Sequence, residues 1–349
     1  MPSIKDVAEN AGVSIATVSR VLANKPHVRP EVRQRVLTAV QELNYRPNLI
    51  ARSLRAKKSN TIGLIVADIQ NPFFTALSRA VEDVAYEQGM SLFLCNTDED
   101  ADKEAIYLEL MRDKHVAGII ISPTRETSDA FFEMLKWNIP MVVIDRQVDD
   151  VEVDTVLIDN TESAYRLTEH LIADGHRRIG AMFGLGSSTG RHRREGFLQA
   201  LQDHGLEAAP ELVVDVNARE EDGYQTTQQF LSLPEPPNAI LTSSGLLSAG
   251  AFRALRESKL TIPDDIGFAS FDETGWATLV DPPITVVRQP TYEIGQKATD
   301  LLLERIKAPS RSVREIILKG QLIVRASCGR HTQSDTEIES HMDISVKLP

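Results

Sequence analysis

The sequence predicts an α/β fold in which a small all-helical head precedes two α/β lobes with parallel sheets. In the first 46 residues, apolar side chains recur at helical spacing. From residue 61 onward, continuous apolar runs of strand length alternate with helical stretches, which is the pattern of a parallel sheet covered on both faces. At 349 residues, the chain is long enough for two or three domains.

Charge separates the head from the rest of the chain. Residues 1–60 hold 11 Lys and Arg against 4 Asp and Glu, a net charge of +7. The remaining 27 against 46 give −19, so the whole chain carries −12. Because phosphate repels the acidic part, this division predicts that nucleic acid binds at the head alone.

The head contains two short predicted helices joined by a sharp turn. Gly12 permits the turn, and the hydroxyl of Ser14 is a good cap for the second helix. A third helix beginning at Pro30 is long enough to cover the first two, which together form a helix-turn-helix. The second helix is then free to enter a DNA major groove with Ser14, Ile15, Ala16, Thr17 and Arg20, where Arg20 pairs bidentately with guanine. A plain three-helix packing core is the alternative interpretation.

These segments closely resemble the lactose-repressor (LacI/GalR) family of bacterial transcription regulators. The resemblance is carried by residues 4–8, 12–14, 17–22, 43–48 and 51–54, and it extends to about residue 328. It implies a cytoplasmic, dimeric repressor that binds double-stranded operator DNA, responds to a small-molecule effector, has no enzymatic activity and needs no cofactor or metal. The expected domains are a DNA-binding head (1–46), a hinge helix and linker (47–60), a two-lobed effector-binding and dimerisation domain (61–329) and a disordered tail (330–349).

Residues 47–56 are predicted to form a short hinge helix. Two or three turns without a core beneath them are marginal in water, so such a helix needs something to pack on. In the family, paired hinge helices lie in the minor groove, where a leucine is a wedge between base pairs. The resemblance therefore assigns DNA contacts to Ala51, Arg52, Leu54 and Arg55. The alternative is an ordinary linker. The basic residues around Leu54, which would otherwise be exposed, argue against it.

Two series of strands and helices predict two lobes. The first series has strands at 62–66, 91–95, 118–121 and 141–144, with helices near 72–88, 102–114 and 127–138. The second has strands at 179–183, 212–216, 239–242 and 266–270, with helices near 160–174, 190–204, 222–231 and 246–259. The later elements, at 285–287, 292–306 and 314–325, return across the lobes. The resemblance implies a periplasmic-binding-protein-like fold in which the chain crosses between lobes three times.

Ligands of parallel α/β sheets lie beyond the carboxyl ends of the strands, so the residues just after each strand are candidates for an effector site. The candidates are Phe73, Phe74, Arg146, Ser187, Thr189, Arg191, Arg193, Ser244, Asp272 and Trp276. The resemblance makes Phe73 or Phe74 an aromatic wall, Arg193 the cation and Asp272 an acceptor from ligand hydroxyls. The two phenylalanines are alternatively core residues, and Arg146 is alternatively a local partner of Asp145.

Sugar-binding members of the family commonly carry Asn-Asp where this chain has Ser244-Gly245. This departure removes an acidic acceptor and leaves Arg146, Arg191 and Arg193 as cations suited to a carboxylate. The sequence therefore favours a sugar acid such as gluconate or 2-ketogluconate, with a neutral sugar or a purine as the alternatives.

Other classes of protein find less support in the sequence. The glycine-rich loop 184–190 only weakly suggests a dinucleotide site, and a solute-binding protein would need a signal peptide. The histidines at 170, 176, 192 and 204 are expected on helix ends or surfaces, where they form no catalytic set. Cys95 and Cys328 are expected to be buried free thiols, because they show no metal-ligand spacing. No apolar run approaches the ~18 residues of a membrane span, which predicts a cytoplasmic protein.

Overall fold

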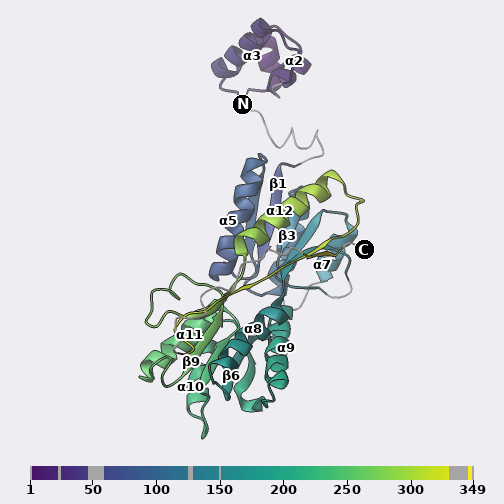
Figure 1. Cartoon of the computed structure of the whole chain (residues 1–349). Coiled ribbons are helices and arrows are strands. Elements are labelled where there is room, and N and C mark those ends of the chain that lie inside the picture. Colours follow the sequence, from purple (N-terminus) through teal and green to yellow (C-terminus); the bar gives the residue numbers. More distant parts are fainter. Residues whose placement is uncertain are drawn as a thin grey trace. The chain divides into compact units, whose positions relative to one another are not determined.

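The computed structural model describes residues 2–22, 25–45, 59–124, 129–148, 151–329 and 345–347. The chain divides into two compact units, Met1–Ser59 and Asn60–Pro349 (Figure 1). The expected hinge helix lies outside the described residues, and with it Ala51, Arg52, Leu54 and Arg55.

Within residues 2–22 and 25–45, the head unit contains three helices around one small core, as the spacing of its apolar residues predicts. They are α1 (Ile4–Ala11), α2 (Ile15–Leu22) and α3 (Pro30–Glu42). A capping box of Ser3 and Asp6 starts α1, and Gly12 ends it with φ 63°, in the left-handed region that favours glycine. The Thr17 backbone N–H donates to Ser14 Oγ at 3.2 Å, so Ser14 caps α2 as predicted.

The second unit contains two lobes, each with a sheet between two pairs of helices (Figure 1). In lobe 1, the strand order is β13-β11-β5-β4-β3-β1-β2. These strands are β1 (Thr61–Val66), β2 (Ser91–Asn96), β3 (Gly118–Ile121), β4 (Met141–Ile144), β5 (Asp154–Ile158), β11 (Glu315–Leu318) and β13 (Ser345–Lys347). All pairs are parallel except β11 with β13.

The helices of lobe 1 bury alternate residues of its strands on opposite faces of the sheet. They are α5 (Pro72–Glu87) and α12 (Thr291–Lys307) on one face, and α6 (Ala101–Asp113) and α7 (Asp129–Lys136) on the other. Along β1, Leu64 packs against α5 and α12, whereas its neighbour Ile65 joins the core beneath α6 and α7. A strand buried on both faces has no polar face, which explains its continuous apolar run.

Lobe 2 repeats this architecture with the strand order β12-β10-β9-β8-β6-β7. Its strands are β6 (Ile179–Gly184), β7 (Val213–Val216), β8 (Ala239–Thr242), β9 (Gly267–Phe271), β10 (Thr285–Arg288) and β12 (Gln321–Ile323). The helices α8 (Asn160–Ala173) and α9 (Ser188–Asp203) cover one core, and α10 (Glu220–Leu231) and α11 (Gly245–Glu257) cover the other. A short 3-10 helix, η1 (Pro210–Leu212), precedes β7.

Up to β12 the chain passes between the lobes at three places, as the family resemblance implies, and the pairing of β13 with β11 places Ser345–Lys347 back in lobe 1. It leaves lobe 1 after β5, returns after β10 to form α12, and leaves again between β11 and β12. The three passages lie close together, since the Asp159 backbone N–H donates to the Leu318 carbonyl oxygen at 2.9 Å and a Cβ at Gly320 would lie 2.9 Å from Val287 Cγ1. The two lobes face each other across a gap that parallel strand ends border.

Two elements depart from the sequence-based expectations. The sequence does not predict strand β5, because Asp154 at its start suggests a polar loop. In the structure Arg305 and Arg311, which are distant in the sequence, pair with Asp154 and allow it to be buried in a strand. Within the tail expected to be disordered, Ser345–Lys347 pairs with β11 as strand β13; the rest of that tail lies outside the described residues.

Candidate functional site

A cavity of about 480 Å³ lies between the two lobes at the carboxyl ends of their strands. Its lining comes from both lobes and from the second passage between them. The lining residues are Asp68, Gln70, Asn71, Phe73, Phe74, Asp98, Glu99, Asp145, Arg146, Gly184, Ser187, Thr189, Gly190, Arg193, Ala218, Arg219, Glu220, Ser243, Ser244, Leu246, Asp272 and Gln289. A pocket of this size accommodates a small organic ligand.

Arg193 is the buried cation of the pocket. Its Nε donates to Asn160 Oδ1 at 2.7 Å, its Nη1 donates to the Ser243 carbonyl oxygen at 2.5 Å, and its guanidinium stacks 4.1 Å from the centre of the Phe271 ring. Burial lowers the pKa of Arg193, and the nearby carboxylates of Asp272 and Asp145 oppose that effect. These contacts fix the plane of the guanidinium and leave Nη2 without a hydrogen-bond partner among the described residues.

Asp272 follows β9 and places its carboxylate at the start of α11. Its Oδ2 accepts from the Gly245 backbone N–H at 3.0 Å, and its Oδ1 accepts from Gln289 Nε2 at 2.6 Å. The residue lies in the left-handed region with φ 70°, which turns the chain sharply out of the strand. Asp145, which follows β4 in lobe 1, has the same backbone conformation with φ 67°. The two lobes therefore present one carboxylate each at matching positions.

Asp145 and Arg146 do not form the close local pair that their adjacency suggests. The Arg146 guanidinium instead holds Glu99 in two hydrogen bonds of 2.5 and 2.7 Å, and its Nε stays 3.7 Å from Asp145 Oδ2. Although burial disfavours the charge of Arg146, its hydrogen bonds with Glu99 raise its pKa. Burial raises the pKa of Asp145, and the positive charges of Arg146 and Arg193 only partly offset that effect.

Acidic groups outnumber basic groups around the pocket. The lining contains the acids Asp68, Asp98, Glu99, Asp145, Glu220 and Asp272 and the bases Arg146, Arg193 and Arg219. Arg146 lies nearest to Asp145, with its Nε 3.7 Å from Asp145 Oδ2, but its guanidinium is shared with Glu99, and Arg193 is the cation whose charge acts on both Asp145 and Asp272. The sequence predicts a cationic pocket from Arg146, Arg191 and Arg193. The structure places Arg146 and Arg193 there with Arg219 in place of Arg191, and six acids outnumber these three bases.

Three predicted hydroxyl-bearing residues lie at helix starts that border the pocket. Ser187 Oγ accepts from the Gly190 backbone N–H at 3.0 Å and caps α9, while the Thr189 hydroxyl donates to Ser187 at 3.2 Å. Ser244 Oγ accepts from the Leu247 N–H at 3.3 Å and caps α11. Ser187 and Ser244 therefore serve as helix caps, Thr189 supports Ser187, and the two capped helix N-termini border the pocket.

Eight of the ten predicted effector residues border the pocket, and Arg191 and Trp276 do not. Phe73 and Phe74 line the pocket and also belong to the core of lobe 1, so their place in the core does not exclude contact with a ligand. Arg191 lies two residues before Arg193 on α9, which turns it to the opposite, exposed side of the helix. Trp276 packs 5.4 Å from the ring of Phe252 at the edge of the lobe 2 core.

Sequence reasoning missed several polar residues of the lining. Asp98 and Glu99 follow β2, Arg219 and Glu220 follow β7, and Gln289 follows β10. All five lie just beyond the carboxyl end of a strand. The signal was therefore present in the sequence, and applying the strand-end rule to every strand would have found them.

One hydrogen bond joins the lobes at the edge of the pocket. The backbone N–H of Gln147, in the loop after β4 of lobe 1, donates to Ser188 Oγ at the start of α9 in lobe 2 at 3.0 Å. A ligand that binds between the lobes can favour either an arrangement that keeps this hydrogen bond or one that breaks it. Its affinity therefore depends on how the lobes are arranged.

In the head, the predicted DNA-facing residues lie on the outer side of α2. Val18 and Val21 are buried in the core, whereas Ser14, Ala16 and Arg20 are exposed and the Ile15 side chain is 42% exposed. An exposed isoleucine beside an exposed arginine suits contact with base edges in the major groove, where apolar groups meet the thymine methyl.

A helix-turn-helix head with a free basic helix, followed by two lobes around a ligand-sized polar pocket, defines a ligand-controlled DNA-binding regulator. Residues 3–48 match the bacterial regulatory proteins of the lacI family. Residues 59–326 match the periplasmic binding proteins and sugar binding domain of the LacI family. The chain therefore belongs to the LacI family of bacterial regulatory proteins.

Individual relatives agree with this assignment over nearly the whole chain. The HTH-type transcriptional repressor PurR of Pasteurella multocida (strain Pm70) is 35% identical over 329 residues, which are 94% of this chain and 98% of that protein. The lac repressor dimer bound to operator and the anti-inducer ONPF is similar with a TM-score of 0.84 and 26% identity, over 94% of this chain and 99% of that chain. A complex of the transcriptional regulator CelR with cellobiose is similar with a TM-score of 0.70 and 28% identity, over 94% of this chain and 100% of that chain.

The chain is thus a DNA-binding transcriptional repressor of the LacI family and not an enzyme. Among the helices of the described residues, none combines the length and apolar character needed to cross a bilayer.

Proposed function

We propose that this repressor is controlled by a neutral, hydroxyl-rich ligand of the carbohydrate class, bound in the pocket between the lobes. The proposal depends on one observation: the buried guanidinium of Arg193 lies near the carboxylates of Asp145 and Asp272, while Glu99 occupies Arg146. Ligand hydroxyls can donate to the two carboxylates and accept from Arg193 at the same time.

This arrangement argues against the sugar acid that the sequence favoured. A ligand carboxylate placed on Arg193 would also face the negative charges of Asp145 and Asp272, and like charges repel strongly where water is excluded. A second free cation would offset that repulsion, but Arg146 is engaged by Glu99, the charge of Arg219 already acts on Asp98, and Arg191 lies outside the pocket. A neutral sugar avoids this cost, and cellobiose, which is bound to the structural relative CelR, is a neutral sugar.

A purine is the second candidate, because Phe73 and Phe74 give the pocket an aromatic wall. The two rings meet edge to face, with centroids 5.0 Å apart, and both are largely buried in the lobe 1 core. Only one side of a flat base would therefore find an aromatic surface. This geometry ranks a purine below a sugar.

Ligand binding can control DNA binding because the pocket is built from both lobes. A ligand that contacts Arg193 and Asp272 in lobe 2 and Asp145 in lobe 1 favours one arrangement of the lobes over another. By linkage, the same free-energy difference appears as a change in operator affinity. The sign of that change distinguishes an inducer from a corepressor, and operator binding measured with and without the ligand determines it.

Thermal-shift screening of the full chain tests the identity of the ligand. A ligand that binds only the folded state raises the melting temperature. At a ligand concentration 100 times its Kd, it adds about 2.7 kcal/mol to the free energy of unfolding. We expect a shift from at least one neutral mono- or disaccharide and none from gluconate or 2-ketogluconate. A response confined to sugar acids or to purines would overturn the proposal on the ligand and leave the family assignment intact.

Two arginine variants show whether the responding ligand occupies this pocket. Arg193→Ala should abolish the thermal shift, because it removes the buried guanidinium whose charge acts on both Asp145 and Asp272 in the pocket. Arg191→Ala is the matched control, since it removes an arginine two residues away that faces outward. Equal loss in both variants would place the ligand elsewhere.

We further propose that the repressor is a homodimer that associates through the β2 edge of lobe 1. Strand β2 ends the sheet, and its Phe93 and Leu94 side chains are 44% and 45% exposed. Tyr86 at the end of α5 and Ile106 and Leu110 on α6 are exposed as well. Monomeric proteins rarely leave such apolar side chains uncovered on an open sheet edge. A dimer also brings two heads to the two halves of a palindromic operator.

Sedimentation of a charged variant tests this interface. Leu94→Glu should convert the dimer to a monomer and sharply weaken operator binding, because a dimer that cannot form cannot place two heads on one operator. Phe132→Glu is the control, since Phe132 on α7 is 41% exposed but lies away from the β2 edge. A Leu94→Glu variant that sediments as a dimer would rule out this surface.

A further inference from the structure

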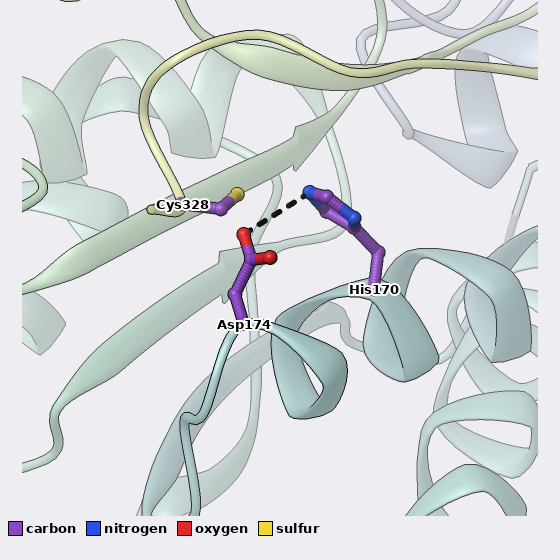
Figure 2. Close-up of side chains that lie close together, drawn as sticks. All are labelled: His170, Asp174 and Cys328. Atoms are coloured by element: carbon purple, nitrogen blue, oxygen red, sulfur yellow. Dashed lines mark ion pairs between the residues drawn. The ribbon is translucent and has the colours of Figure 1, made fainter. Parts of the chain in front are cut away.

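Three potential metal ligands meet in lobe 2, outside the pocket. His170 and Asp174 lie at the end of α8, and Cys328 lies in the segment that follows β12. Figure 2 shows that the imidazole, the carboxylate and the thiol converge on one point. Their ligand atoms all lie within 4.8 Å of one another. Neither the proposed effector site nor DNA binding uses any of these side chains.

The spacing within this cluster suits a tetrahedral ion. Two ligands of tetrahedral zinc, with bonds of about 2.0–2.3 Å, lie about 3.5 Å apart. His170 Nε2 and Asp174 Oδ2 are already 3.5 Å apart, because residues i and i+4 of a helix share one face. Cys328 Sγ completes the triangle within 4.8 Å, so closing the site requires a shift of about 1 Å at the thiol side.

The surroundings hold the ligands in place. The carbonyl oxygen of Cys328 accepts a hydrogen bond from His176 Nε2 at 2.6 Å, which fixes the position of the segment 324–329 that follows β12. Gly329 packs directly on Asp174, since a Cβ at residue 329 would lie 3.1 Å from Asp174 Oδ2. The His170 and Asp174 side chains are only 12% and 14% exposed, and Cys328 is buried. Metal sites in proteins characteristically combine converging ligands with such fixed surroundings.

We propose that His170, Asp174 and Cys328 form a binding site for a zinc-class divalent cation, with a water as the fourth ligand. One thiolate, one imidazole and one carboxylate together are a donor set that favours zinc or cobalt over the hard cations magnesium and calcium, which prefer oxygen alone. On binding, the Cys328 thiol releases its proton to solvent and the sulfur bonds to the metal. The ion then links the end of α8 to the segment 324–329 that follows β12.

The alternative is a helix-end ion pair of His170 and Asp174 beside an inert thiol. Burial raises the pKa of the Cys328 thiol to about 12, so without a metal it remains protonated, and it donates weakly to the Phe268 carbonyl at 3.4 Å. An ion pair and a metal site differ in one measurable respect, which is whether the sulfur becomes a ligand.

Cobalt(II) is the probe that reports on this sulfur. The full chain carrying Cys95→Ala, which leaves Cys328 as its single cysteine, is titrated with cobalt under reducing conditions. We expect a near-ultraviolet sulfur-to-cobalt charge-transfer band that saturates at one ion per chain and disappears when zinc is added. In Cys95→Ala/Cys328→Ser, the band should be absent. If the Cys95→Ala protein shows no such band, the metal site does not exist.

Two further variants separate coordination from folding. On the Cys95→Ala background, His170→Gln and Asp174→Asn should each weaken cobalt binding at least about tenfold, with the metal-free melting temperature measured as a check on the fold. His204→Gln is the matched control, because His204 pairs with Glu169 at 3.8 Å on the neighbouring surface without a cysteine nearby. Unchanged cobalt affinity in both cluster variants, or equal weakening in the His204 control, would overturn the proposal.

Discussion

At the scale of single residues, the pocket shows how buried charges share a limited number of partners. Arg146 forms two hydrogen bonds with Glu99 and keeps only a longer ion pair of 3.7 Å with its neighbour Asp145, because Glu99 meets the guanidinium in a bidentate geometry that an adjacent residue cannot reach. Asp145 is left largely desolvated beside Asp272 and Arg193. The Asp145 carboxylate therefore lies in an environment suited to hydroxyl donors, and burial makes its ionised form less favourable than it is in water.

The raised pKa of Asp145 predicts how its removal changes stability with pH. A carboxyl whose pKa is higher in the folded protein than its ordinary 3.8 costs stability as pH rises from that value through the folded pKa. Asp145→Asn avoids this cost and tolerates the left-handed backbone equally well. We therefore expect the variant to gain in melting temperature relative to the wild type as pH rises from about 4 to 7. A difference that is constant with pH would contradict this assignment of the pKa shift.

Arg20 is the residue of α2 best placed to distinguish one operator from another. If it forms a bidentate pair with guanine, Arg20→Ala should cost about 1–3 kcal/mol on the cognate operator and relax the preference at one base pair. Gel-shift titration with cognate and random DNA measures both quantities. An equal loss on the two DNAs would assign Arg20 to a phosphate contact.

At the scale of elements, lobe 2 is built from helix pairs that touch through glycines. A Cβ at Gly250 of α11 would lie 1.8 Å from the Glu220 carbonyl oxygen of α10, and one at Gly196 of α9 would lie 2.1 Å from the Thr161 carbonyl oxygen of α8. These contacts allow neighbouring backbones to meet directly and so set the positions of the α9 and α11 N-termini at the pocket. The helices were predictable from their periodicity, but this close approach was not.

Gly250→Ala should therefore separate α10 from α11 and destabilise the protein. Overpacking of this kind costs about 1–3 kcal/mol, and a backbone atom cannot move aside as a flexible side chain can. Gly275→Ala is the control, because a Cβ there meets nothing within 4 Å and the residue has no positive φ. Denaturant unfolding compares the two variants. Equal stability would show that the helices separate without cost.

At the scale of the whole molecule, opposite charges divide the tasks between the two units. The head carries +7 and the rest of the chain −19, so DNA attracts one part and repels the other. The pocket, by contrast, binds its proposed ligand through buried groups that dissolved salt screens poorly.

Salt should therefore affect the two binding events differently. A dimer whose heads contact about 6–10 phosphates loses roughly 10³–10⁵ in operator affinity between 50 and 200 mM salt, because counterions released on binding must compete with those in solution. Ligand affinity, measured by calorimetry in the same buffers, should change less than about tenfold. A strong salt dependence of ligand binding would indicate that the ligand is charged and would favour the sugar acid after all.

The sequence by itself determined most of the elements and the order in which they follow one another; the strands β5 and β13 are the exceptions. Local rules are sufficient for this, because the period of the apolar residues, the cap at Ser14 and the turn at Gly12 all act within a few positions. The strand-end rule also brought Arg193 and Asp272 to the correct edge of lobe 2, since parallel strands end together. The motifs of the head were specific enough to indicate the family.

Only the tertiary structure decided which of these residues pair with one another. Glu99 neutralises Arg146 across 47 positions, Asp154 becomes a strand residue because Arg305 and Arg311 reach it, and Cys328 meets His170 from the far end of the chain. A pairing of this kind depends on distances that the fold sets and that no local pattern encodes. The electrostatics of the pocket, on which the proposed class of ligand depends, therefore became accessible only after the lobes were assembled.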